Sequence, residues 1–429
     1  MDWRIKKADG GLRGELTVPP DKSISHRAVM FGAISGGDCR IHNFLSGEDC
    51  MRTFEAFRAM GIEITMKGGV VTVRGKGLKG LTAPAGDLYM GNSGTSMRII
   101  SGIVAAQGFG VRLTGDESLS GRPMSRVIEP LKMMGARIDT VNGKFPPILS
   151  RGVRNNLKPL RYTTPVPSAQ VKSCILAAGL YAGGKTSVTE KFQSRDHTER
   201  ILEYFSADIA RKGLTTEIDG LKELAPKDIT VPGDISSAAF FIVGGLTVKR
   251  SDLILKDVGL NPTRDGVITV LGRMGARIDI LDKRDGFEPV GDIRVRTSDL
   301  HGTVVEQKEM PLLIDEVPAL IIAAVMAEGR TEIRGISELK VKETDRVKTM
   351  KDNLLRLGVE IFEEGDCLVI NGGGKIFRPA ELDSYGDHRI AMSMAVASLL
   401  SDGECLIKNT ACADTSYPGF LKDLEKVRA

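Results

Sequence analysis

The chain has 429 residues, 41% hydrophobic and 27% charged, and this length predicts two or three domains rather than a single core. The 59 basic and 55 acidic residues leave a formal net charge of +4, which is too small for a nucleic-acid-binding protein. The longest apolar runs are too short to span a bilayer, and the charged first ten residues lack a signal-peptide core, so we expect a soluble, cytoplasmic protein.

Six helical stretches rich in small residues recur along the chain at intervals of about 70 residues, the signature of an internal repeat. They begin near Ser23, Gly94, Ser168, Asp234, Asp315 and Asp387. Between them a second phrase recurs, in which a helix ends in Gly and runs into a strand, as at Gly61, Gly135, Gly275 and Gly358. Gly after the last helical turn ends a helix, and the alternation that follows predicts a half-buried strand. A worn copy of this phrase lies near Ser206.

Each repeat therefore predicts helix, strand, helix and strand, with hairpins between repeats. The period alone is compatible with one solenoid or with two domains. Residues 225–234 (APKDITVPGD) echo residues 14–21 (GELTVPPD), as two chain crossings between domains would. We therefore expect an α/β protein with one domain of residues 1–20 and 233–429, another of residues 21–232, and crossings near 19–21 and 231–234.

In the first half of the chain, charged and small polar residues cluster where these helices start. A helix N-terminus offers free N–H groups and a positive dipole, so it suits anions. The candidates are Lys22, Ser23 and Arg27 in PPDKSISHR, Asn92 and Gly94 in GNSGTSMR, and Ser168, Ala169 and Gln170 in SAQVKS. Taken singly, each motif is equally typical of an ordinary capped surface helix, and their recurrence favours binding. Arg122 and Arg195 lie in turn-like segments, and an arginine fork can grip phosphate or carboxylate.

The second half carries the candidates for acid–base chemistry. Asp315 lies in DEVPAL, Lys342, Glu343 and Arg346 lie in KETDR, and His388 and Arg389 lie in DHRIAM. The structural alternatives are helix capping for the first motif, a solvated turn for the second and a buried structural ring for His388. Carboxylates surrounded by cations stay ionised and can exchange protons with a substrate.

Seven phrases in order, PPDKSISHR, GNSGTSMR, SAQVKS, SRDHTER, DEVPAL, KETDR and GDHRIAM, resemble the 5-enolpyruvylshikimate-3-phosphate synthase (EPSP synthase) family over essentially the whole chain. The resemblance implies two domains, each of three βαβαββ-type units arranged as the inside-out α/β barrel of the enolpyruvyl transferases. It implies transfer of the enolpyruvyl group of phosphoenolpyruvate to the 5-hydroxyl of shikimate 3-phosphate with release of phosphate. This step belongs to the shikimate pathway, toward chorismate and the aromatic amino acids.

The resemblance also implies a role for each matching residue. Shikimate 3-phosphate would be bound by Lys22, Ser23, Arg27, Ser168, Ala169, Gln170, Arg195, Asp315 and Lys342. Phosphoenolpyruvate would be bound by Lys22, Asn92, Gly94, Arg122, Gln170, Arg346, His388 and Arg389. Asp315 would accept the proton of the hydroxyl, and Glu343 with Lys22 would deliver a proton to C3 of phosphoenolpyruvate.

The scattered cysteines and histidines form neither a CxxC pair nor a ligand spacing, so we expect reduced thiols, no metal and no cofactor. The resemblance further implies a monomer and, through Gly94, glyphosate as a candidate inhibitor. One branch of the family carries a Lys near the C-terminus where this chain has Thr415 and Ser416, which leaves one phosphoenolpyruvate contact unassigned. Two alternatives stay open: the related enzyme that acts on UDP-N-acetylglucosamine, and a non-catalytic anion-binding repeat protein.

Overall fold

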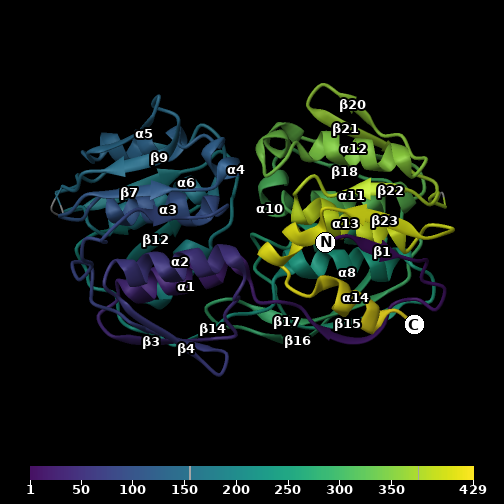
Figure 1. Ribbon diagram of the computed structural model, residues 1–429, viewed down its shortest axis with the longest axis horizontal. Coiled ribbons are helices and arrows are strands. Elements are labelled where there is room, and N and C mark those ends of the chain that lie inside the picture. Colours follow the sequence, from purple (N-terminus) through teal and green to yellow (C-terminus); the bar gives the residue numbers. More distant parts are fainter. Residues whose placement is uncertain (154–155, 375) are drawn as a thin grey trace. The chain divides into compact units, whose positions relative to one another are not determined.

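A computed structural model describes residues 1–153, 156–374 and 376–429. Its internal contacts divide the chain into two compact units, drawn in Figure 1. Unit 1 consists of Met1–Pro19 together with Pro232–Ala429, and unit 2 consists of Pro20–Val231. The chain therefore starts in unit 1, builds unit 2 without interruption, and then completes unit 1.

Unit 2 contains three four-stranded sheets of the same topology. The first has the order β14 (Ile229–Thr230), β3 (Asp38–His42), β5 (Val70–Arg74), β4 (Glu63–Lys67). The second has the order β6 (Leu88–Tyr89), β7 (Val111–Thr114), β9 (Phe145–Ser150), β8 (Ile138–Val141). The third has the order β10 (Arg161–Thr163), β11 (Lys185–Thr189), β13 (Thr215–Asp219), β12 (Asp208–Lys212). In each sheet the first pair is parallel and the other two are antiparallel.

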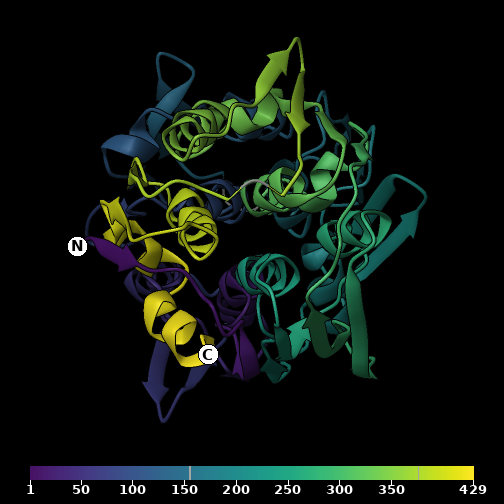
Figure 2. The ribbon, with the colours of Figure 1, turned by 90° about the vertical axis from the view of Figure 1, so that its right-hand side faces the viewer.

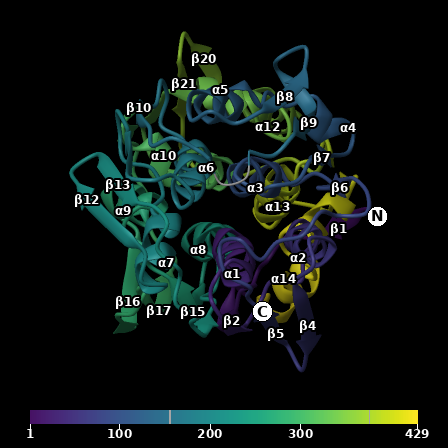
Figure 3. The ribbon, with the colours of Figure 1, turned by 90° about the vertical axis from the view of Figure 1, so that its left-hand side faces the viewer.

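Three helices form the centre of unit 2: α1 (Lys22–Ala33), α3 (Gly94–Val104) and α6 (Ala169–Gly179). They are buried almost all round, and α3 packs against both α1 and α6, as Figure 3 shows from the side of unit 2. The other helices are α2 (Glu48–Ala59), α4 (Glu117–Ser120), α5 (Ser125–Met133) and α7 (His197–Tyr204). A helix that is apolar or small on every face can be stable only when other elements surround it, so the small-residue pattern of the sequence selects these three as the interior.

Unit 1 repeats the arrangement, with its first strands taken from the start of the chain. Its first sheet has the order β16 (Arg277–Arg284), β17 (Val290–Arg296), β15 (Asp252–Gly259), β2 (Arg13–Thr17). The second has the order β18 (Val304–Val305), β19 (Arg330–Arg334), β21 (Cys367–Asn371), β20 (Phe362–Glu364). The third has the order β1 (Trp3–Ile5), β23 (Cys405–Lys408), β22 (Glu381–Asp383). The last sheet has three strands, because β1 stands where the other repeats place a hairpin.

The central helices of unit 1 are α8 (Ile235–Thr247), α11 (Val317–Met326) and α13 (His388–Ser398), which pack against one another. Figure 2 shows them nearly end-on at the middle of the unit. The remaining helices are α9 (Gly266–Arg273), α10 (Met310–Leu313), α12 (Arg346–Arg356) and α14 (Phe420–Val427), with 3₁₀ segments η1 (Ile336–Val341) and η2 (Thr410–Thr415). The predicted α/β class and the βαβαββ repeat are confirmed by these sheets and their crossover helices.

The repeated helix-to-strand phrase has a single backbone cause. Gly61 and Gly275 take the left-handed conformation, with φ of +84° and +89°, directly after the last turns of α2 and α9. In the worn copy Ser206 adopts the same conformation, with φ of +63°, after α7. Glycine adopts this conformation without steric cost, whereas Ser adopts it only at a cost in energy. The fold therefore imposes the turn even where the sequence does not favour it.

No helix in the described part of the chain is both long and apolar enough to cross a membrane.

Candidate active site

In unit 2, the first two turns of α1 carry two cations, Lys22 and Arg27. The N-cap Asp21 accepts a hydrogen bond from the N–H of Ile24 at 2.8 Å, so Asp21, and not Ser23, caps this helix. Lys22 opens the helix, and its Nζ lies 3.2 Å from a carboxylate oxygen of Asp49 at the start of α2. Both side chains keep some exposure, 17% and 14%, so the ammonium is held by its partner and still reaches solvent.

Arg27 lies one turn further and is almost completely buried. Its Nε donates to the hydroxyl of Thr198 at 2.6 Å, its Nη2 to the hydroxyl of Ser173 at 2.9 Å, and its Nη1 to the backbone oxygen of Ser23 at 2.9 Å. Thr198 lies on α7 and Ser173 on α6, so the guanidinium is oriented by three helices before any ligand arrives.

The start of α3 carries Asn92 and Gly94. The side-chain oxygen of Asn92 accepts a hydrogen bond from Arg122, and its amide nitrogen donates to Asp116 at 2.9 Å. The N-cap of α3 is Ser93, which accepts from the N–H of Ser96 at 3.2 Å. A Cβ added at position 94 would lie 3.4 Å from Nη1 of Arg98 and 3.6 Å from Nη1 of Arg122. The missing side chain therefore leaves the space beside two guanidinium groups open.

The first turns of α3 and α6 are joined by side chains. Arg98 donates to the side-chain oxygen of Gln170, and the amide of Gln170 donates to the hydroxyl of Thr95 at 2.9 Å. Ser168 caps α6 by accepting from Val171 N–H at 3.4 Å. Gln170 is thus fixed in both of its functional groups by α3.

Ala169 is the first residue of α6 and is partly exposed. Arg195 is half-buried in the segment between β11 and α7. Its neighbour Ser194 is buried and donates to a carboxylate oxygen of Glu190 at 2.5 Å. The loop that carries Arg195 is therefore anchored to the interior of unit 2.

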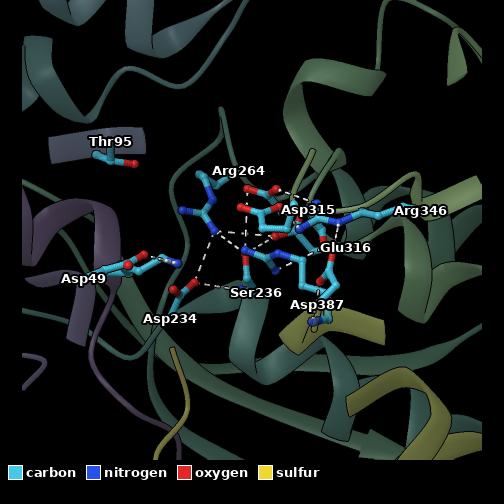
Figure 4. A network of polar contacts seen from close by, with 12 residues as sticks. Asp49, Thr95, Asp234, Ser236, Arg264, Asp315, Glu316, Arg346 and Asp387 are labelled. Atoms are coloured by element: carbon cyan, nitrogen blue, oxygen red, sulfur yellow. Dashed lines mark hydrogen bonds and ion pairs between the residues drawn. The ribbon is translucent and has the colours of Figure 1, made fainter. Parts of the chain in front are cut away.

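In unit 1, one guanidinium collects three carboxylates. Arg346 opens α12 with a side chain only 2% exposed. Its Nη1 lies 3.3 Å from Asp315, its Nη2 2.6 Å from Glu343, and its Nε 2.8 Å from Asp387. Figure 4 shows the side chains of Asp315, Arg346 and Asp387 gathered in this network. Burial tends to lower the pKa of Arg346, but the carboxylates of Asp387, Glu343 and Asp315 outweigh it and raise that pKa, so the group stays charged.

Arg389 approaches Asp315 from α13. Its Nη1 donates to the backbone oxygen of Asp315 at 3.0 Å, and its Nη2 lies 3.6 Å from the carboxylate. Its Nε is buried and has no hydrogen-bond partner among the described residues, so a donor is left for a ligand. His388 opens α13 and is buried, and Lys342 follows η1 and is partly exposed.

The carboxylates at the start of α11 do not cap that helix. Glu316 occupies the N-cap position, yet the helix has no side-chain cap hydrogen bond. The simple capping interpretation of DEVPAL is therefore wrong. Asp387, in contrast, does cap α13, by accepting from the N–H of Arg389 at 2.8 Å, while it also binds Arg346.

Sequence reasoning missed two polar partners of the cations on α1. Asp49 and Thr198 lie far from their partners in sequence and carry no local signal. Among the described residues, no group of three or more His, Cys, Asp or Glu side chains is arranged to hold a metal ion.

Comparisons with known proteins agree over the full length. The family described as EPSP synthase (3-phosphoshikimate 1-carboxyvinyltransferase) matches residues 6–424. A 3-phosphoshikimate 1-carboxyvinyltransferase of Solibacter usitatus is 50% identical over 430 residues, covering 100% of both chains. One of Citrifermentans bemidjiense is 49% identical over 418 residues, covering 97% of each chain. A solved EPSP synthase structure from Acinetobacter baumannii superimposes with a TM-score of 0.89 at 46% identity, covering 100% of this chain and 98% of the other.

Proposed function

Because the chain belongs to the EPSP synthase family, we propose that it transfers the enolpyruvyl group of phosphoenolpyruvate to shikimate 3-phosphate, with Asp315 and Glu343 as its acid–base pair. The observation that carries this proposal is the guanidinium of Arg346, which holds both carboxylates at 3.3 and 2.6 Å. The two acids come from different segments of unit 1 and are fixed by one rigid fork.

The acceptor, shikimate 3-phosphate, is held by cations and hydroxyls. Lys22, Ser23 and Arg27 bind it from α1, and Arg27 is pre-oriented by its hydrogen bonds to Thr198 and Ser173. The remaining residues proposed to bind it are Ser168, Ala169, Gln170, Arg195, Asp315 and Lys342. The free N–H groups at the start of α6 suit its phosphate.

The donor, phosphoenolpyruvate, is held chiefly by arginines. Arg122 stands beside the open space at Gly94, and Arg389 offers its buried Nε. The other residues proposed to bind it are Lys22, Asn92, Gln170, Arg346 and His388. Fixed guanidinium groups orient the carboxylate and phosphate and stabilise charge that develops during the reaction.

The reaction proceeds by addition and elimination. The acceptor's 5-hydroxyl oxygen bonds to C2 of phosphoenolpyruvate, Asp315 takes the hydroxyl proton, and C3 receives a proton from Glu343, aided by Lys22. The product of this step is a tetrahedral ketal phosphate with a methyl group at C3. Glu343 takes back a proton from C3, which restores the double bond as the bond from C2 to the phosphate oxygen breaks. Inorganic phosphate leaves, and Asp315 gives up its proton to solvent or to the departing phosphate.

The C-terminal region leaves one donor contact unassigned. Thr415 ends η2 and Ser416 follows it, so neither residue offers the cation that one branch of the family carries nearby. Tyr417 is fully buried and packs against Phe241 and Phe420. This stretch anchors α14 to the core of unit 1.

Glyphosate, an anionic amine with a phosphonate and a carboxylate, is proposed to compete with phosphoenolpyruvate beside Gly94. A methyl group at this position meets only the ends of flexible side chains, so Gly94→Ala should fold normally. It should fill space beside Arg98 and Arg122 and weaken glyphosate more than it weakens shikimate 3-phosphate. Inhibition curves at fixed phosphoenolpyruvate measure this, and an unchanged inhibition constant would remove glyphosate from this position.

We further propose that the protein acts as a monomer in the cytoplasm. Sedimentation velocity over a range of concentrations tests the first part, and fractionation of cells that express the protein tests the second.

The function is tested by phosphate release from phosphoenolpyruvate with two acceptors in parallel, shikimate 3-phosphate and UDP-N-acetylglucosamine. The proposal predicts release with the first acceptor alone. Release with the nucleotide sugar alone would move the protein to the related cell-wall reaction. Folded protein that releases phosphate with neither acceptor would favour the non-catalytic anion-binding alternative.

A further inference from the structure

Unit 1 contains a buried ion pair, Arg264 with Glu316, next in the chain to the proposed catalytic residue Asp315. The proposed function assigns no role to either residue of the pair. Arg264 and Glu316 have side chains 2% and 0% exposed, and Nη2 of Arg264 lies 3.4 Å from Oε1 of Glu316. The same nitrogen lies 3.1 Å from Asp234, the N-cap of α8. The hydroxyl of Ser236 contacts both Arg264 and Glu316 (Figure 4). Arg264 thus connects the beginnings of α8 and α11.

Arg264 is presented by a rigid loop between β15 and α9. The side-chain oxygen of Asn261 accepts from the N–H of Thr263 at 2.7 Å, and the N–H of Arg264 donates to the backbone oxygen of Asn261 at 2.8 Å. The amide of Asn261 also donates to Glu288 at 2.8 Å. Because Asn261, Thr263 and Glu288 are buried, these hydrogen bonds hold the backbone of Arg264 in place.

Glu316 is the chain neighbour of Asp315, and the two side chains are held by different arginines. Glu316 is bound by Arg264 and Ser236, whereas Asp315 is bound by Arg346 and Arg389. The N–H of Glu316 donates to Leu313 at 2.9 Å, and its carbonyl accepts from Leu320 at 2.9 Å. The two residues share a peptide plane, whose carbonyl oxygen accepts from Arg389. Holding the Glu316 side chain therefore limits the rotations open to the backbone that carries Asp315.

An ion pair of this kind is better suited to orienting side chains than to stabilising the fold. Removing two charges from water costs about as much as their attraction returns, so an apolar pair would hold two helices equally well. A guanidinium fork, in contrast, accepts a carboxylate only in a defined geometry. Among the six central helices that the structure describes, α11 is the one without a side-chain cap, and the pair orients the start of that helix.

We propose that Arg264, acting through Glu316, is a positioning residue that sets the orientation of Asp315, an inference that rests on the proposed role of Asp315 as proton acceptor. A catalytic group displaced by about 1 Å can lose roughly 100-fold in rate. Loss of the pair should therefore lower kcat and leave phosphoenolpyruvate binding nearly intact.

The test compares Arg264→Gln, Glu316→Gln and the double variant with the wild type, by phosphate release and by thermal unfolding. Each single variant should lower kcat by roughly 10-fold to 100-fold and change the KM for phosphoenolpyruvate less than twofold. The singles also strand a buried charge, so they should unfold at lower temperature, whereas the double variant should regain much of the lost stability. Its kcat should stay low. A double variant with wild-type kcat would overturn the inference.

A second readout separates positioning from general structural damage. In an Asp315→Asn background, measured by single turnover, Arg264→Gln should cause no further loss of rate, because it acts through the missing carboxylate. The same fold-loss in both backgrounds would overturn the inference and leave the proposed function standing. Asp315→Asn with wild-type kcat would overturn both. Arg294→Gln, which breaks an exposed pair with Asp252, is the matched control and should keep wild-type kcat.

Discussion

At the scale of the residue, the site is built from side chains whose partners lie far away in the sequence. Arg346 holds Asp315 and Glu343, and Arg389 holds the backbone of Asp315 as well. Both acids keep partly exposed side chains, 17% and 27%, while the guanidinium beneath them is buried. The buried guanidinium therefore holds both acids in place, while their exposed parts stay accessible to a ligand.

Replacing Asp315 by Asn should remove the proposed proton acceptor and keep the shape of the side chain. We expect kcat to fall by roughly 100-fold to 10,000-fold, the usual contribution of general acid–base catalysis. Phosphate release at saturating substrates measures this loss. Asp352→Asn changes a carboxylate of an exposed pair with Lys348 and should keep full activity. Equal kcat values for the two variants would contradict the role of Asp315.

His26 predicts a pH dependence of stability. Burial, followed by the charges of Lys22 and Arg27, lowers its pKa well below the ordinary value of about 6.5. As pH falls below about 6.5, the unfolded chain therefore takes up a proton that the folded chain does not. The contribution of His26 is complete above this pH and is lost by about 1.4 kcal/mol per pH unit below it, until the folded pKa is reached.

Urea unfolding of the wild type and of His26→Gln at pH 7.5 and 5.5 measures this effect. Other groups titrate equally in both proteins, so the difference between their pH dependences isolates His26. The wild type should lose more stability than the variant over this range, by up to about 1.4 kcal/mol. Equal losses would show that folding does not lower the pKa of His26.

At the scale of the element, the sequence predicted the central helices well. The starts expected near Ser23, Gly94 and Ser168 lie within one residue of the first residues of α1, α3 and α6. Small residues, N-cap side chains and period all point to the same boundaries, which is why local reasoning succeeded. Local reasoning did not predict which side chains bind one another, such as Gln170 with Thr95 or Arg264 with Glu316. Packing in three dimensions determines such pairs, and spacing along the chain does not.

Helix α6 contains a buried ion triad whose loss should be costly. Lys172 is 1% exposed and lies 2.6 Å from Glu190 and 2.8 Å from Glu199, which are equally buried. Burial tends to lower the pKa of Lys172, but Glu199 and Glu190 outweigh it and raise that pKa. Removing the ammonium would leave two carboxylates facing each other without a cation.

Lys172→Met should therefore destabilise the protein by about 3–5 kcal/mol. This loss corresponds to a decrease on the order of 10 °C in the midpoint of thermal unfolding. Lys348→Met, which breaks an exposed pair with Asp352, is the control and should cost less than about 1 kcal/mol. Calorimetry measures the unfolding midpoints of both variants. Similar midpoints would mean that Glu190 and Glu199 do not form the buried ion pairs with Lys172.

At the scale of the whole molecule, one repeat accounts for both units. Unit 2 is continuous in sequence, whereas unit 1 takes β1 and β2 from the first residues of the chain. The period predicted the repeats because each must supply a buried helix and a sheet. It could not predict that β1 replaces a hairpin in the last sheet, since that pairing joins opposite ends of the chain.

The most direct test of the central claim is proton NMR of the reaction product in deuterium oxide, with phosphoenolpyruvate and shikimate 3-phosphate as substrates. Addition and elimination through a C3 methyl group predicts an enolpyruvyl ether of shikimate 3-phosphate that carries deuterium in its vinyl methylene group, together with inorganic phosphate. Formation of pyruvate and a doubly phosphorylated acceptor, or an enolpyruvyl product without deuterium, would contradict the account.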